Sequence, residues 1–173
     1  LRNGVDYADR SRRIAAPGAD LASLDGGVIA ARSDMALVAG RIDNTAYMTA
    51  GGTLLIDANE LANRKRNAEY SAKQRVKGGY LYSWGDTVQP GGYLQAAEWQ
   101  LNVRRVVSVS GEFVVSDPDP AVRARASAQL EAELRETLGE AYEASVAEDH
   151  LQHRFKPKKK RSFGGLLGAV AAL

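Results

Sequence analysis

The chain contains no cysteine and few aromatic residues. Of its 173 residues none is Cys, and aromatic side chains make up 7%. The absence of cysteine excludes a disulfide framework and any zinc or redox site built on thiolates. Because Phe, Tyr and Trp are scarce, a core has to be assembled from Ala, Val, Leu and Ile, which favours thin stacked layers over one thick globule. The length predicts one domain, or one compact unit with an appendage.

The sequence also lacks a leader peptide and a run long enough to cross a bilayer. No basic-then-apolar stretch follows Leu1, which is typical of a start inside a longer protein. The most apolar stretch, residues 163–173, has eleven residues, against about twenty needed for a membrane span. The net charge is only +2. Basic residues gather near the two ends of the chain, and acidic residues are most concentrated between 117 and 149.

An internal repeat is the strongest signal. Residues 26–44 superpose on residues 45–63 after a shift of nineteen positions. The shift places Leu37 on Ile56 and Asn44 on Asn63, and nearly every apolar position keeps its type. A period of about twenty residues with short β-like runs and glycine corners is typical of a solenoid, in which each rung buries one face against the next.

A third, looser copy is predicted over residues 88–102. There Gly91, Gly92 and Leu94 repeat the spacing of Gly51, Gly52 and Leu54. Paired glycines suit a tight corner between two strands. The asparagines that close the first two copies have two interpretations, namely a hydrogen-bonded ladder inside a corner and ordinary turn residues.

The predicted strands extend to about residue 115. Residues 64–77 carry seven charges and no apolar period, so we expect a loop or a helical excursion there. Alternating aromatic residues at 80, 82 and 84 and a β-branched run up to 115 predict further strands. The residues expected to point inward are Val28, Ile29, Leu37, Leu54, Ile56, Leu61 and Leu94.

A change of pattern at residue 116 predicts a helix. The run Asp117-Pro118-Asp119-Pro120 is a helix-start signal. Leu130, Leu134 and Leu138 then recur at four-residue spacing. We therefore expect one helix from 120 to about 150, within a helical segment 116–155, whose leucine stripe docks on the shaft or on another chain and covers its open edge.

With repeat, corners and tail in view, the sequence resembles the filamentous haemagglutinin and contact-dependent inhibition exoproteins of the two-partner secretion pathway. The residues that carry the resemblance are 36–44, 50–58 and 61–63, which match the family's glycine-bearing, leucine-alternating rung. Asn59 departs from that rung, because it stands where the family has glycine and where the first copy keeps Gly40. The resemblance is good over residues 26–63, looser to residue 113, and beyond that it rests only on a basic cluster before a Gly/Ala-rich stretch.

The resemblance implies a mainly β chain built as a right-handed parallel β-helix with rungs of about 19–20 residues. In these terms residues 1–19 are a lead-in segment, 20–115 are shaft rungs with a charged excursion at 64–77, 116–155 are helical, and 156–173 are a basic and then apolar tail. It also implies export through an outer-membrane transporter and display on the bacterial cell surface, with the C-terminal part in the periplasm during export.

Motifs for catalysis are weak, and the sequence predicts no enzyme, no cofactor and no metal. His150 and His153 lie three apart without a third firm ligand and are expected to be solvated groups at a helix end. Asp34, Asp43 and Asp57 do not align between the repeat copies, so stacked calcium carboxylates are not expected, and Asp86 is read as a solvated turn acid.

The basic tail is the predicted binding site. Five positive residues fall within positions 156–161, which favours a polyanion or membrane surface, although a disordered linker stays an alternative. The predicted polyanion-binding residues are Arg154, Lys156, Lys158, Lys159, Lys160 and Arg161. No nucleic-acid partner is expected.

Two functions are carried forward from the sequence. The first is a non-catalytic segment of a secreted, surface-displayed filamentous adhesin that contacts host-cell glycans or receptors. The second is a junction or processing region of a contact-dependent toxin-delivery exoprotein, which controls export or display of a C-terminal effector. Both expect the transporter and the rest of a long chain as partners.

Overall fold

A computed structural model describes residues 1–3 and 27–159 of the chain, which are mainly β-strand with one α-helix. The lead-in segment predicted at 1–19 lies almost entirely outside these residues. The elements are β1 (Arg2–Asn3), β2 (Val28–Ala31), β3 (Met35–Asn44), β4 (Tyr47–Ala50), β5 (Thr53–Arg64), β6 (Asn67–Val76), β7 (Gly79–Val88), β8 (Tyr93–Ala96), β9 (Glu98–Val109), β10 (Glu112–Val115), α1 (Pro120–Leu138), the short 3-10 helix η2 (Gly139–Ala141), β11 (Tyr142–Ser145) and β12 (His150–Pro157).

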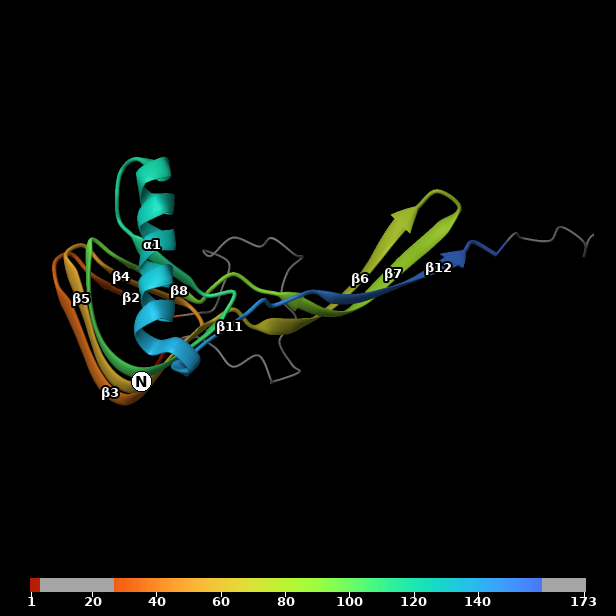
Figure 1. Cartoon of the computed structure of the whole chain (residues 1–173). Helices are drawn as coiled ribbons and strands as arrows, with labels where there is room; N and C mark the ends of the chain where they lie inside the picture. The colour runs from red at the N-terminus through yellow and green to blue at the C-terminus, as the bar shows by residue number, and fades with distance from the viewer. Residues whose placement is uncertain (4–26, 160–173) are drawn as a thin grey trace, which may run out of the picture.

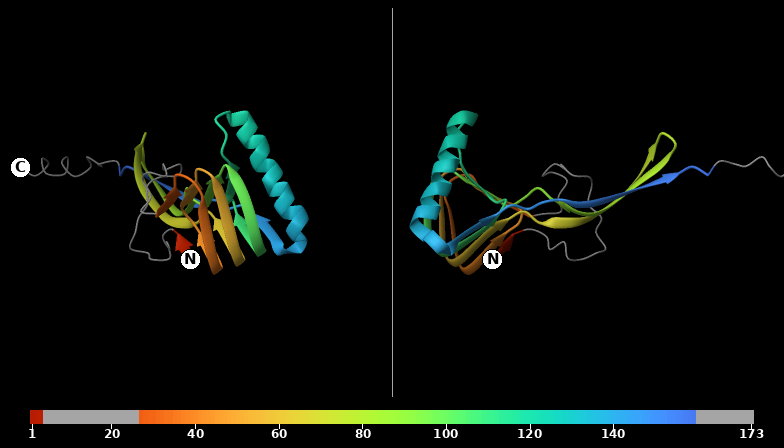
Figure 2. Two further views of the ribbon diagram at one scale, coloured as in Figure 1. Left: turned by 90° about the vertical axis from the view of Figure 1, so that its left-hand side faces the viewer. Right: turned by 45° about the vertical axis from the view of Figure 1, so that its right-hand side comes forward.

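The described strands form three sheets. One sheet is parallel with five strands in the order β1-β3-β5-β9-β11, and a second is parallel with four strands in the order β10-β8-β4-β2. Together with α1, these make up what we call the body. The third sheet is antiparallel with the order β12-β7-β6, and it projects away from the body as a long arm (Figures 1 and 2).

The nineteen-residue repeat predicted from the sequence is confirmed as the pairing register of the parallel strands. Leu37 lies beside Ile56 and Asn44 beside Asn63 in neighbouring strands β3 and β5. The next layer interrupts the period, because Asn63 pairs with Ser108, 45 positions further on. The extra residues are the β6–β7 hairpin, which leaves the body after β5 and returns before β8.

The register predicted for the third copy is wrong. Leu94 lies beside Met48, not beside Leu54, and Ala97 takes the place opposite Gly52. Gly91 and Gly92 instead lead the chain back from the hairpin into β8. Their φ angles are 138° and 62°, and a Cβ on Gly91 would lie 2.2 Å from the Thr45 carbonyl oxygen, so glycine is needed there for conformation and for space.

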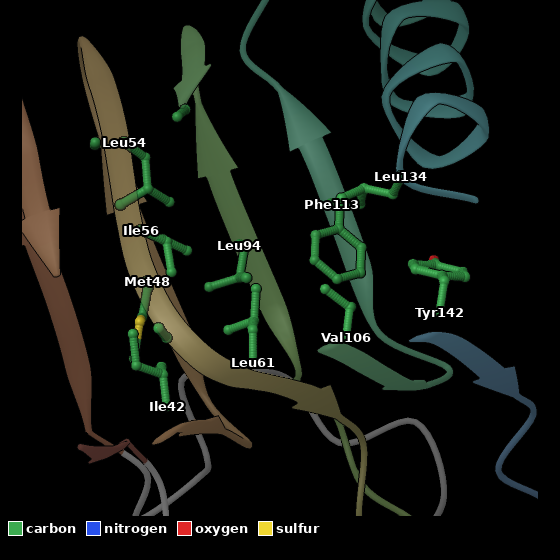
Figure 3. Packing of buried hydrophobic residues seen from close by; sticks show 13 residues of the cluster. Ile42, Met48, Leu54, Ile56, Leu61, Leu94, Val106, Phe113, Leu134 and Tyr142 are labelled. Carbon is green, nitrogen blue, oxygen red and sulfur yellow. The ribbon is translucent and has the colours of Figure 1, made fainter. Parts of the chain in front are cut away.

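The core lies between the two parallel sheets and under α1 (Figure 3). Leu54, Ile56, Leu61 and Leu94 are fully buried, as predicted. The inward residues of the first layer, Ile29 and Leu37, are only half-buried. Val28 was predicted to point inward but is 67% exposed, because alternation along β2 turns its neighbour Ile29 to the core instead.

Asparagine side chains form a ladder at one corner of the body. The Asn3 amide donates to Asn44 Oδ1 at 3.0 Å, and the Asn44 amide donates to Asn63 Oδ1 at 2.9 Å. Asn63 then donates to the Glu112 carbonyl. All three asparagines are buried. The structure therefore shows the hydrogen-bonded ladder and not ordinary turn residues. Each buried amide finds hydrogen-bond partners in adjoining layers.

The helix begins as predicted and ends earlier. Asp119 caps its N-terminus, since its carboxylate accepts from the backbone N–H groups of Ala121 and Val122. It ends at Leu138 and not near residue 150. The predicted helical segment 116–155 is therefore wrong beyond residue 138, apart from the short 3-10 helix η2. Gly139, with a φ of 53°, stops the helix, and the chain returns to strand as β11 on β9 and β12 on β7. The leucine stripe docks on the body, with Leu134 buried against the core.

The charged excursion is also corrected, because residues 67–76 form strand β6 and not a loop or a helix. Apolar and charged side chains alternate along it, with Ala68, Tyr70 and Ala72 on one face and Glu69 and Lys73 on the other. The many charged residues make this period of two hard to see in the sequence. It specifies a strand once β7 pairs with these residues in antiparallel fashion over ten residue pairs.

A buried ion pair beside the ladder makes the body sensitive to acid. Asp43 is 4% exposed and lies 2.6 Å from an Arg64 nitrogen and 3.5 Å from an Arg66 nitrogen. Burial raises the pKa of Asp43, but the hydrogen bonds and charge of Arg64, with the charges of Arg66 and Arg41, outweigh it and hold the pKa below its ordinary value of 3.8.

We expect Asp43→Asn to lower the free energy of unfolding at neutral pH by about 2 kcal/mol, since it removes the charged acceptor of the partly buried Arg64 and Arg66. In the wild type this contribution is complete above pH 3.8 and is lost as the pH falls through the lower pKa of the folded state. Urea unfolding from neutral pH into this range measures both effects. Equal acid sensitivity in the two proteins would contradict the assignment.

Candidate functional site

The arm consists of the β6–β7 hairpin and of β12, which returns from the C-terminal side of the body to pair along β7 (Figure 1). Gly78, with a φ of 86°, makes the hairpin turn. On β12, Pro157 lies opposite Gly79 at the turn end, and His150 lies opposite Asp86 at the body end. A strand whose paired residues lie 64 to 78 positions later in the chain is thereby placed beside the hairpin.

One face of the arm gathers aromatic and cationic side chains. Residues directly opposite each other in an antiparallel sheet point to the same face. Tyr80 lies between Arg75 and Lys156, and Tyr82 lies between Lys73 and Arg154. Trp84 follows, between Ser71 and Gln152. We call this surface the aromatic face; it comprises Tyr80, Tyr82, Trp84, Lys73, Arg75, Arg154 and Lys156.

The tyrosine rings hold the lysine ammonium groups over the sheet. Lys73 Nζ lies 4.4 Å from the ring centroid of Tyr80 and 5.6 Å from that of Tyr82, and Lys156 Nζ lies 5.5 Å from that of Tyr82. These distances are those of cation–π contacts, which attract a cation to the ring without neutralising it. The face therefore presents fixed positive charge, and its ring faces are partly covered by ammonium groups.

The four cations form two rows, one on each side of β7. Adjacent strands lie about 4.8 Å apart and alternate residues in a strand about 6.8 Å apart, so the rows are roughly 10 Å apart across the sheet. Lys73 and Arg75 make one row, and Arg154 and Lys156 make the other. Charges this close reinforce one another within a Debye length of about 10 Å at 0.1 M salt, so the face attracts multivalent anions.

The structure divides the residues predicted as the basic site. Arg154 and Lys156 belong to the aromatic face. Lys158 and Lys159 are exposed beyond the end of β12. Lys160 and Arg161 lie outside the described residues.

The other half of the face was not predicted. Lys73 and Arg75 come from the stretch expected to be a loop or helix, and Tyr80, Tyr82 and Trp84 were taken only as strand residues. Alternation of these aromatics in the sequence was a usable signal of a common face. No local pattern could have paired them with residues 154 and 156.

The histidines lie on β12 and not at a helix end, which corrects their predicted setting. His153 Nδ1 is 2.8 Å from Ser83 Oγ, within hydrogen-bond distance. In the part of the chain that the structure describes, no three His, Cys, Asp or Glu side chains are placed to hold a metal ion.

The four acidic residues considered for calcium or catalysis are dispersed. Asp34 accepts a hydrogen bond from the Thr53 backbone N–H, and Asp43 is engaged by Arg64. Asp57 is exposed on β5, and Asp86 lies on the arm.

Among the described residues, no helix combines the length and apolar character that crossing a membrane requires.

Comparison of the chain with protein-family models, with curated proteins and with solved structures finds no match.

Proposed function

We propose that this chain is a non-catalytic segment of a secreted, surface-displayed filamentous adhesin, placed where a right-handed parallel β-helix shaft reaches a helical cap. The observation that carries the proposal is the nineteen-residue register between β3 and β5, with the asparagine ladder running through the same layers. Layers that repeat in sequence and stack in parallel register are typical of a solenoid built for length and stiffness.

The adhesive role is assigned to the arm. It stands away from the body (Figure 2), so a large ligand can reach it. Its aromatic face carries four cations in two rows. We propose a polyanionic host-cell glycan as the ligand, because two rows of cations suit a linear polymer with anionic groups along both edges. The resemblance to two-partner secretion exoproteins adds an outer-membrane transporter and the cell surface to the proposal.

Retention on a sulfated glycan tests the site with two matched variants. The face variant carries Lys73→Ser, Arg75→Ser, Arg154→Ser and Lys156→Ser. The tail variant carries Lys158→Ser, Lys159→Ser, Lys160→Ser and Arg161→Ser. Each removes four positive charges.

We expect the face variant to lose about 3 kcal/mol of binding, roughly a hundredfold in affinity for heparin, because each exposed ion pair contributes up to about 1 kcal/mol. The tail variant should lose much less. Wild-type elution should shift strongly with salt. Equal losses in both variants would mean that heparin responds to charge count alone, and unchanged binding by the face variant would remove the arm from the proposal.

The junction function has one specific observation in its favour. The parallel stacking ends in the described residues at β10 and β11, where α1 packs against the last layer. A cap of this kind suits the boundary between a shaft and a following domain. A requirement of α1 for export or effector delivery in the full-length protein, with heparin retention unaffected, would favour the junction over the adhesin.

A further inference from the structure

Charge on the aromatic face of the arm is divided along its length. The cations occupy the levels of Tyr80 and Tyr82, toward the hairpin turn. Two residues beyond Trp84, the level of Asp86 carries Glu69 on β6 and His150 on β12, so both carboxylates of this level lie at the body end of the same face. Trp84, 40% exposed, stands between the two regions.

The acidic end continues toward the body. Glu148 precedes β12 and is exposed, and its carbonyl accepts a hydrogen bond from the Asn67 side chain at the Val88 level. Asp149 accepts from the Val88 backbone N–H. The face thus carries its lysines and arginines over the outer half and its carboxylates, with His150 among them, over the inner half, and Trp84 lies at the boundary.

We propose that two copies of this chain associate face to face through the aromatic face. The two-fold axis lies between the two sheets, runs across the strands and passes at the level of Trp84. It reverses strand direction, so the outer half of one arm meets the inner half of the other. Lys73 then faces the second copy's Glu69 along β6, and the two Trp84 side chains meet at the centre.

Charge selects this arrangement over its alternative. On the β12 side the same axis brings Arg154 opposite the second copy's His150, with Asp86 of that copy one strand away, and brings Lys156 toward its Glu148. A two-fold axis parallel to the strands and above β7 would instead bring Lys73 onto the second copy's Arg154 and Asp86 onto its Asp86, which is repulsive. A self-complementary patch with an aromatic anchor and a charged rim is the form that a two-fold interface requires.

The size of the arm makes the association weak. Three strands of about ten residues offer roughly 450 Å² per copy from strand spacing and rise. Two copies then bury roughly 900 Å², below the approximately 1,200 Å² at which standard stable interfaces begin. The association is therefore transient and salt-sensitive at the level of single domains, and it strengthens when several arms are tethered together.

Pairing covers the cations that the proposed function assigns to a glycan, so the two bindings compete for one face. The pairing itself rests on the divided charge and on Trp84, and it stands without the glycan proposal. Substitutions in the acidic half of the face distinguish the two proposals. Replacing acid by base there should strengthen polyanion binding and weaken self-association.

Analytical ultracentrifugation of two charge-reversed proteins tests the pairing. One carries Lys73→Glu with Arg154→Glu, and the other carries Glu69→Lys with Asp86→Lys. We expect wild-type protein to self-associate at high concentration and low salt, and each variant alone to associate at least about tenfold less, because like charges now face one another. An equimolar mixture should recover association, since the reversed faces complement each other.

Circular dichroism checks that both variants fold, and Trp84→Ser should weaken association without altering charge. A wild type that stays monomeric, or a mixture that stays monomeric, would overturn the pairing. Stronger heparin retention by the Glu69→Lys, Asp86→Lys protein supports the glycan site. If that gain appears while the mixture stays monomeric, the pairing fails and the proposed function stands; if the mixture associates without the gain, the reverse holds.

Discussion

Ile56→Asp should lower the free energy of unfolding of the body by about 4 kcal/mol or more, because the substitution places an unpaired charge in an apolar interior. Ile56 is fully buried at the centre of β5, where it lies between Leu37 of β3 and Leu101 of β9. Its surroundings offer no cation. Since single domains are stable by only about 5–15 kcal/mol, the variant should be largely unfolded under mild denaturing conditions.

Urea unfolding monitored by circular dichroism measures the loss, and Val28→Asp is the matched control. Val28 is apolar and lies on the strand β2 of the same body, but its side chain is 67% exposed. We expect its replacement to change stability by no more than about 0.5 kcal/mol. If Ile56→Asp proved as mild as the control, Ile56 would have to lie outside the core, and the assignment of inward positions would be wrong.

Removal of the cap should have the second large effect. In a chain that ends at Ser116, α1 and β11 no longer cover the end of the parallel sheets. Leu134 and Tyr142 leave the core, and Phe113 and Trp99 lose the helix that packs beside them. At about 1.5–3 kcal/mol for each fully buried side chain, the loss is on the order of 5 kcal/mol.

The truncated chain should also aggregate, because the outer edges of β9 and β10 become available for pairing. A chain that ends at residue 147 is the control, since it keeps α1 and β11 and loses only β12 and the tail. We expect this control to remain soluble with a body of nearly wild-type stability. Light scattering and thermal unfolding compare the three lengths. Full solubility and stability of the chain ending at Ser116 would refute the capping role of α1.

The register between β3 and β5 could be predicted because it depends on residues that are close together in the sequence. Each layer repeats the same alternation of apolar and polar residues, and a slip of one position would turn Leu54 and Ile56 outward, so the pattern specifies which residues pair. The register predicted for the third copy was wrong because local composition misled the alignment. The glycine pair at 91 and 92 looks like the corner at 51 and 52, but it serves the return from the hairpin, and sequence spacing cannot distinguish two turns of similar composition.

The helix end and the arm show the limit of local information. Residues 142–145 and 150–157 were predicted to belong to the helical segment, yet they lie in strands because β9 and β7 offer open edges with which they can pair. Gly139 stops the helix, but the choice of strand after it depends on partners 36 or more positions away in the sequence. Propensity is a weak local preference, and tertiary pairing overrides it here.

The sequence by itself determined the nineteen-residue register of β2 with β4 and of β3 with β5, the buried positions Leu54, Ile56 and Leu61, and the start of α1 at the capped proline. Each of these depends on neighbours within about twenty residues. Tertiary structure alone decided the aromatic face. Lys73 and Tyr82 come from one hairpin, and Arg154 comes from a strand in which it lies 72 positions after Tyr82; they share a face only because β12 pairs along β7. A sheet assembles its surface from strands without regard to their distance along the chain, so the charges that meet on it leave no joint pattern in the sequence.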